Sequence, residues 1–145
     1  MTRVVVADDH AAVREGVRNI LRQAPDIEIA GEASDGAQAL RLVAELAPDV
    51  LLLDMEMPGM NGVDVARQLK AAQSPVRILA VSAYDDEQYV YGLLASGAAG
   101  YLLKEDAPTT LVDAVRSISS GQHGWISTRV AARMAAYASR LEWPV

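Results

Sequence analysis

Five side chains that can take part in ionic chemistry lie where short apolar runs of the chain end. They are Asp8, Asp9, Asp54, Ser82 and Lys104. Carboxylates crowded together need a cation, because two charges ~4 Å apart interact by about 4 kcal/mol at an effective dielectric of 20. Oxygen ligands without a thiolate favour Mg²⁺ over zinc. Because a carboxylate beside Mg²⁺ can attack phosphorus, these residue types predict phosphoryl chemistry.

These side chains are far apart in the sequence, so only the order of the secondary structure can bring them together. Short apolar runs alternate with amphipathic stretches along the chain, which is typical of strands alternating with helices. That order implies an α/β fold with an open, doubly wound parallel sheet. The carboxyl ends of its strands share one edge, and ligands bind there. We therefore expect the five side chains to converge at that edge.

The predicted sheet has five strands, each followed by a helix. The strands are predicted over residues 4–8, 27–33, 50–54, 76–83 and 100–104, and the helices over 11–25, 34–48, 63–72, 85–97 and 107–121. Ser34 or Asp35 is the expected cap of the second helix and Asn61 that of the third. The third strand, "VLLLD", is apolar throughout, which indicates burial on both faces. Asp54 is the favoured nucleophile because it ends this central strand.

The alternation of predicted strands and helices stops after Gly121. Residues 1–121 are predicted to form one domain, and residues 122–145 to form a linker with one further helix over about 128–141. No sixth strand is expected there. Whether this tail packs on the domain, pairs with a second copy or only links is left open by the sequence.

Composition limits the function further. The 145 residues carry a net charge of −6 and no cysteine. The acidic balance argues against direct binding of nucleic acid, which needs clustered Lys and Arg. No secretory signal or membrane-spanning run is visible. We expect a soluble, cytoplasmic protein that does not bind membranes.

Four segments, taken in order, resemble the receiver domain of bacterial two-component response regulators. They read "ADDHAAVREGV", "PDVLLLDMEMPGMNGVDV", "ILAVSAYDD" and "GAAGYLLKEDAP". Each is weak alone, but their ordered spacing is specific and covers about residues 2–121. "DDH..VREG" and "GYLLKEDAP" are similar to the NarL/FixJ-type (LuxR-type output) subfamily. The resemblance implies a flavodoxin-like fold with strand order 2-1-3-4-5.

The resemblance also implies roles for the acidic residues. Asp54 would accept a phosphoryl group from a phosphohistidine on a sensor histidine kinase. Asp9 and Asp54 would bind Mg²⁺ directly, with the backbone carbonyl of Glu56 as a further ligand. Asp8 would act through a bound water.

The resemblance implies a conformational switch as well. Ser82 and Lys104 would contact the phosphoryl oxygens, and Tyr101 would turn inward as Ser82 moves. Many receivers carry proline directly after the lysine, whereas Glu105 stands here.

Regulators of this subfamily continue into a helix-turn-helix DNA-binding domain. The sequence ends with "RLEWPV", about where that domain would begin. We expect the natural protein to continue, to dimerise on phosphorylation and to regulate transcription, contacting DNA only through that further domain.

Simpler interpretations exist for several of these residues. Asp8 and Asp9 could be helix caps, Tyr101 could be ordinary packing, and His10 is expected to be structural. A stand-alone or phosphorylation-independent receiver is the alternative function. An Asp-nucleophile phosphatase of the haloacid dehalogenase type is a remote one, because its acid–base Asp would stand where Glu56 is. We predict a switch rather than an enzyme.

Overall fold

The computed structural model describes residues 1–83, 97–121, 125–126, 132 and 135. The helix predicted over residues 85–97 lies outside them apart from Gly97. The helix predicted over 128–141 lies outside them apart from Ala132 and Ala135. Both helices therefore stay predictions.

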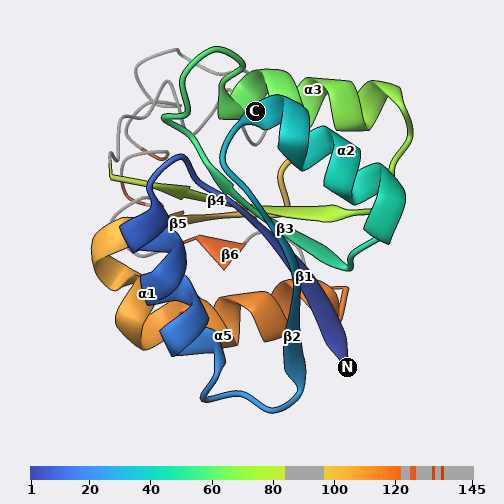
Figure 1. The fold of residues 1–145 in the computed structure, drawn as a ribbon. Helices are drawn as coiled ribbons and strands as arrows, with labels where there is room; N and C mark the ends of the chain where they lie inside the picture. Colours follow the sequence, from blue (N-terminus) through green and yellow to red (C-terminus); the bar gives the residue numbers. More distant parts are fainter. Residues whose placement is uncertain (84–96, 122–124, 127–131, 133–134, 136–145) are drawn as a thin grey trace.

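Parallel strands form one sheet in the order β2-β1-β3-β4-β5-β6 (Figure 1). The strands are β1 (Thr2–Ala7), β2 (Ile27–Ala33), β3 (Val50–Asp54), β4 (Arg77–Ser82), β5 (Gly100–Leu103) and β6 (Trp125–Ile126). Strand β3 is central, since Leu51 pairs with Val5 of β1 on one side and with Ile78 of β4 on the other. The five predicted strands and their order 2-1-3-4-5 are confirmed.

The expectation that no sixth strand follows is wrong. Trp125 and Ile126 pair in parallel with Gly100 and Tyr101 of β5. An edge strand presents unpaired backbone groups, and β6 covers part of this edge. A strand of two residues is too short to show the alternation by which strands are recognised in a sequence.

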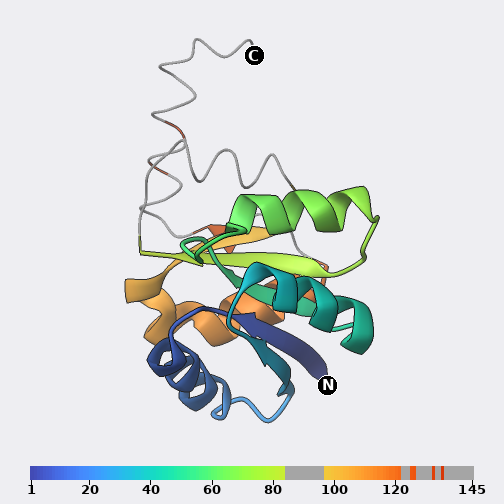
Figure 2. The same cartoon turned by 45° about the horizontal axis from the view of Figure 1, so that its top comes forward.

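Four helices of the described residues cover the two faces of the sheet. Helices α1 (Ala11–Leu21) and α5 (Ala107–Ser119) lie on one face, and α2 (Gly36–Leu46) and α3 (Gly62–Ala71) lie on the other (Figures 1 and 2). A short 3-10 helix, η1 (Lys104–Asp106), leads from β5 into α5.

Side-chain caps mark the starts of α2 and α3. The Asp35 carboxylate accepts a hydrogen bond from Gln38 N, and the Asn61 side chain accepts one from Asp64 N. Each satisfies a backbone donor that the first turn of a helix leaves without a partner. Asp35 is therefore the cap of the second helix, and the Asn61 cap is confirmed.

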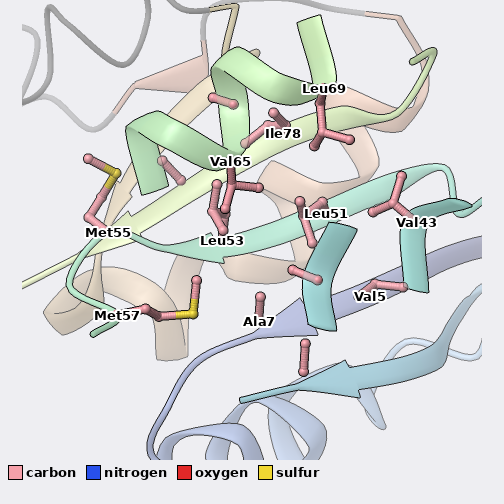
Figure 3. Packing of buried hydrophobic residues seen from close by; sticks show 14 of the residues in the cluster. Val5, Ala7, Val43, Leu51, Leu53, Met55, Met57, Val65, Leu69 and Ile78 are labelled. Carbon is pink, nitrogen blue, oxygen red and sulfur yellow. The ribbon is translucent and has the colours of Figure 1, made fainter. Parts of the chain in front are cut away.

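Alternating side chains of the strands build two separate cores. Leu51 and Leu53 of β3 face α2 and α3, as Figure 3 shows, whereas Val50 and Leu52 face α1 and α5. Burying a side chain of this kind contributes about 1.5–3 kcal/mol. Because β3 is packed on both faces, the residue that ends it, Asp54, is only 2% exposed.

Within the described ranges, no helix combines the length and the apolar character needed to cross a membrane.

Candidate functional site

The structure brings the predicted charged side chains together at the carboxyl edge of the sheet. Lys104 Nζ lies 3.2 Å from Asp54 Oδ1 and 3.6 Å from Asp8 Oδ2. Asp8, Asp9, His10 and Asp54 each offer one ligand atom within 4.8 Å of the others. The edge is therefore a compact acidic pocket with one ammonium group on it.

Three carboxylate oxygens of this pocket accept no hydrogen bond from the described residues. Asp9 Oδ1, Asp54 Oδ2 and Glu56 Oε2 are all buried. Leaving a buried acceptor unpaired costs about 1–3 kcal/mol, and more when it is charged. Hard oxygen donors are the ligands that Mg²⁺ takes in proteins. The residues present therefore fit a divalent cation held by oxygen atoms.

Lys104 follows β5 directly and is the first residue of η1. Partial burial by itself lowers the pKa of the Lys104 ammonium, but the attraction of Asp54 and Asp8 outweighs it, so the pKa is raised. The ammonium group stays protonated and offsets one of the carboxylate charges.

Glu56 contributes its side chain as well as its backbone. Ser82 Oγ donates a hydrogen bond of 2.5 Å to Glu56 Oε1, and Glu56 N donates one of 3.2 Å to Asp54 Oδ1. Burial, followed by the proximity of Asp54, raises the pKa of the Glu56 carboxyl. The sequence predicts a role only for the backbone carbonyl of Glu56, because no local pattern shows which side chain Ser82 contacts.

The loop after Asp54 passes close to the start of α3. A Cβ atom at Gly62 would lie 3.2 Å from Met55 Cα and 3.3 Å from the Asp54 carbonyl oxygen. Any larger residue at this position would push the loop outward. Met55 and Met57 anchor the same loop, since both are buried in the core beneath α2 and α3 (Figure 3).

An arginine of α1 supports the acid pair from outside the pocket. Arg14 donates one hydrogen bond of 2.6 Å to the Asp8 carbonyl oxygen and another of 3.2 Å to Glu32 Oε1. Arg18 contacts both carboxylate oxygens of Glu32, at 2.6 and 2.7 Å. Strand β2 and helix α1 thus jointly fix the end of β1. Arg14 was not predicted as part of the site, because nothing in the sequence distinguishes it from the other arginine of α1.

His10 lies beside the acid pair at the start of α1. Its backbone N–H donates to Asp8 Oδ1 at 2.8 Å, and its Nδ1 lies 3.1 Å from Asp9 Oδ1. The His10 side chain is 64% exposed. The Asp8–His10 contact joins residues two positions apart, as in an Asx turn, and it does not cap α1, whose N-cap His10 comes with no side-chain capping bond.

Tyr101 is fully buried in β5 and belongs to the core beneath α2 and α3. This position agrees with a packing role. The inward turn of Tyr101 during switching stays a prediction.

An open parallel α/β sheet with aspartates and a lysine gathered at its carboxyl edge defines a flavodoxin-like domain with an acidic cluster at that edge. The family model of the response regulator receiver domain matches residues 4–116. The chain belongs to this family, as the resemblance implied.

Curated relatives place the chain near regulators of the NarL type. It is 41% identical to the transcriptional regulatory protein LiaR of Bacillus subtilis over 122 residues, which cover 84% of this chain and 58% of LiaR. It is 46% identical to the probable transcriptional regulatory protein NarL of Mycobacterium tuberculosis over 120 residues, which cover 83% of this chain and 56% of NarL. The chain thus spans little more than half of these relatives.

Solved structures of response regulators are also similar to the chain. The receiver domain of the putative response regulator NarL from Mycobacterium tuberculosis matches with a TM-score of 0.81 and 45% identity, covering 83% of this chain and 98% of that one. A LuxR-family response regulator from Aurantimonas sp. matches with a TM-score of 0.89 and 30% identity, covering 96% and 99%. The isolated receiver domain of Salmonella RcsB with BeF₃⁻ matches with a TM-score of 0.84 and 25% identity, covering 92% and 98%.

Proposed function

We propose that Asp54 accepts a phosphoryl group from a phosphohistidine of a sensor histidine kinase. The observation that carries this proposal is the unequal state of the two Asp54 oxygens. Oδ1 is held by Lys104 Nζ and Glu56 N, whereas Oδ2 is buried and accepts no hydrogen bond from the described residues. One oxygen orients the carboxylate, and the other is left for chemistry.

The reaction exchanges one bond to phosphorus for another. A bond from Asp54 Oδ2 to phosphorus forms as the P–N bond of the phosphohistidine breaks, and the electron pair stays on the imidazole nitrogen. Lys104 and Ser82 would then contact the phosphoryl oxygens. The Lys104 ammonium is already placed 3.2 Å from Asp54 Oδ1 and needs no rearrangement to face the product.

Mg²⁺ would be held by Asp9, Asp54 and the backbone carbonyl of Glu56, with Asp8 acting through water. The ion supplies charge neutralisation for the acidic pocket and for the incoming phosphoryl group. Asp54 Oδ2 and Asp9 Oδ1 support these two as direct ligands, because both are buried and accept no hydrogen bond from the described residues; the contact of Asp9 Oδ1 is with His10 Nδ1, at 3.1 Å. Asp8 differs, because it already accepts a bond from His10 N and lies 3.6 Å from Lys104 Nζ.

Phosphorylation would shift an equilibrium between inactive and active conformations, with Ser82 and Tyr101 as the moving groups. The output would be transcription, through a helix-turn-helix domain beyond this chain and a phosphorylation-dependent homodimer. The names of LiaR and NarL as transcriptional regulators, and the share of their length that this chain spans, support this output. The protein would act in the cytoplasm as a switch rather than as an enzyme.

Acetyl phosphate and Mg²⁺ provide the test, with intact-mass spectrometry as the readout. We expect the wild-type protein to gain the mass of one phosphoryl group and the Asp54→Asn variant to gain none. Asp113→Asn is the matched control, because Asp113 is an exposed aspartate of α5. Modification of Asp54→Asn would overturn the assignment.

The same assay separates the alternatives. A wild-type protein that is neither modified nor able to bind beryllofluoride would be a phosphorylation-independent receiver. Steady turnover of a phosphate ester with Mg²⁺ would indicate the phosphatase.

A further inference from the structure

The hydroxyl of Ser82 is already engaged by a carboxylate. Its Oγ donates a hydrogen bond to Glu56 Oε1 at 2.5 Å, the short end of the range for a hydroxyl donor. Ser82 itself is 1% exposed at the end of β4. The Ser82 end of the pairing is therefore shielded from water, whereas Glu56 is only partly buried.

A serine hydroxyl carries a single proton. It can donate one hydrogen bond at a time. While the proton of Ser82 points to Glu56 Oε1, Ser82 cannot donate it to an oxygen of a phosphoryl group on Asp54. Phosphorylation must break the Ser82–Glu56 bond before Ser82 can recognise the product.

We propose that the Glu56 side chain is a latch that holds Ser82 in its unphosphorylated arrangement and thereby weakens the phosphorylated state. This inference rests on the proposed function of Asp54. It assigns to Glu56 a positioning role, acting through Ser82, that is separate from the role of its backbone carbonyl.

The charges of the pocket favour release of the latch once a phosphoryl group arrives. Asp8 and Asp54 both contact the ammonium of Lys104, and Glu56 lies beside Asp54, to which its backbone N–H donates a hydrogen bond. Further negative charge on Asp54 therefore repels the Glu56 carboxylate. Glu56 is only partly buried, and its Oε2 accepts no hydrogen bond from the described residues. Its side chain can therefore leave towards water by breaking the bond to Ser82.

Beryllofluoride affinity in the presence of Mg²⁺ measures the latch directly, by isothermal calorimetry. We expect Glu56→Ala to bind beryllofluoride more tightly than wild type by roughly three- to tenfold, the range of one net hydrogen bond. Glu56→Gln should gain less, because its amide oxygen still accepts the Ser82 bond but without charge. Both variants are checked for folding by thermal unfolding.

The Ser82→Ala background shows whether Glu56 acts through Ser82. In that background, removing the Glu56 side chain should no longer tighten binding. A gain that persists without the Ser82 hydroxyl would indicate plain charge repulsion and overturn the latch.

Glu105→Ala is the matched control, since it removes a carboxylate from an exposed position directly after Lys104. It should change the affinity by less than about twofold, because exposed charges are screened. An equal gain in Glu105→Ala, or no gain in Glu56→Ala, contradicts the proposal. Failure of the wild-type protein to bind beryllofluoride would instead refute the proposed function itself.

Discussion

The two edges of the sheet use polar groups in opposite ways. At the amino edge, Arg77 donates to the carbonyl oxygens of Ile118 and Ser119, at 3.0 and 2.9 Å. Asp49 Oδ2 accepts from the backbone N–H of Arg3 at 2.8 Å. At the carboxyl edge, by contrast, three buried carboxylate oxygens accept no hydrogen bond from the described residues.

The two edges therefore have different roles: the amino edge stabilises the fold, and the carboxyl edge holds the candidate site. Paired groups at the amino edge lower the free energy of the folded state and offer nothing to a ligand. Buried carboxylate oxygens that accept no hydrogen bond at the carboxyl edge raise that free energy, and the proposed Mg²⁺ would offset this cost on binding. Mutations at the amino edge should therefore change unfolding and leave cation binding unaltered, whereas mutations at the carboxyl edge should do the reverse.

The largest effect is expected for Asp9→Asn at the carboxyl edge. This change removes a proposed direct ligand, so Mg²⁺ affinity should fall by about a hundredfold, at least as much as the loss of an outer-shell partner costs a metal site. In metal-free buffer the free energy of unfolding should be equal to that of wild type or higher, because a repelling charge is gone. Calorimetric titration with Mg²⁺ and urea denaturation measure the two quantities. Marked destabilisation without metal would show that Asp9 belongs to the scaffold.

Arg77→Ala should have the next largest effect, at the amino edge. It removes two charge-assisted hydrogen bonds to the carboxyl end of α5. It also removes the favourable interaction of the Arg77 charge with the dipole of that helix. The free energy of unfolding in urea should fall by about 2 kcal/mol, and Mg²⁺ affinity should stay the same. Arg67→Ala, at an exposed position of α3, is the control and should change neither. If Arg77→Ala weakens Mg²⁺ binding, the two edges are coupled.

Arg14→Ala sharpens the comparison, because Arg14 supports the acidic pocket without lining it. Losing its bond to the Asp8 carbonyl should lower Mg²⁺ affinity by roughly tenfold, the low end of outer-shell effects. Arg22→Ala, near the end of the same helix, is the control. An unchanged affinity would mean that the end of β1 is held without Arg14.

The smallest effect concerns the exposed pair of Asp26 and Arg116 at the amino edge, with bonds of 3.0 and 2.7 Å. The hydrogen bonds from Arg116 lower the pKa of Asp26. A lowered pKa in the folded state contributes stability above the unfolded pKa of Asp26, and that contribution is lost as the pH falls through the folded value. The difference in unfolding free energy between wild type and Asp26→Asn should be small and constant near neutral pH and should shrink in acid. A difference that grows in acid would contradict the assignment.

The fold was largely predictable from local patterns. Alternation within strands, the apolar run of β3 and the caps at Asp35 and Asn61 depend on neighbours only a few residues away. The topological rule for parallel sheets then predicts that Asp54 and Lys104 lie at one edge. The short strand β6 was not predicted, because two residues are too few to show the alternation of buried and exposed side chains that marks a strand.

The sequence by itself determined which residue types stand at the strand ends, because strand and helix periods are local properties of the chain. Only the tertiary structure decided how those side chains are paired. The bond from Ser82 to Glu56 joins residues 26 positions apart, and the bond from Lys104 to Asp54 joins two different strand ends. Such contacts depend on the angles at which loops leave the sheet and on side-chain reach. They form only once packing on both faces of β3 has fixed the positions of its neighbours.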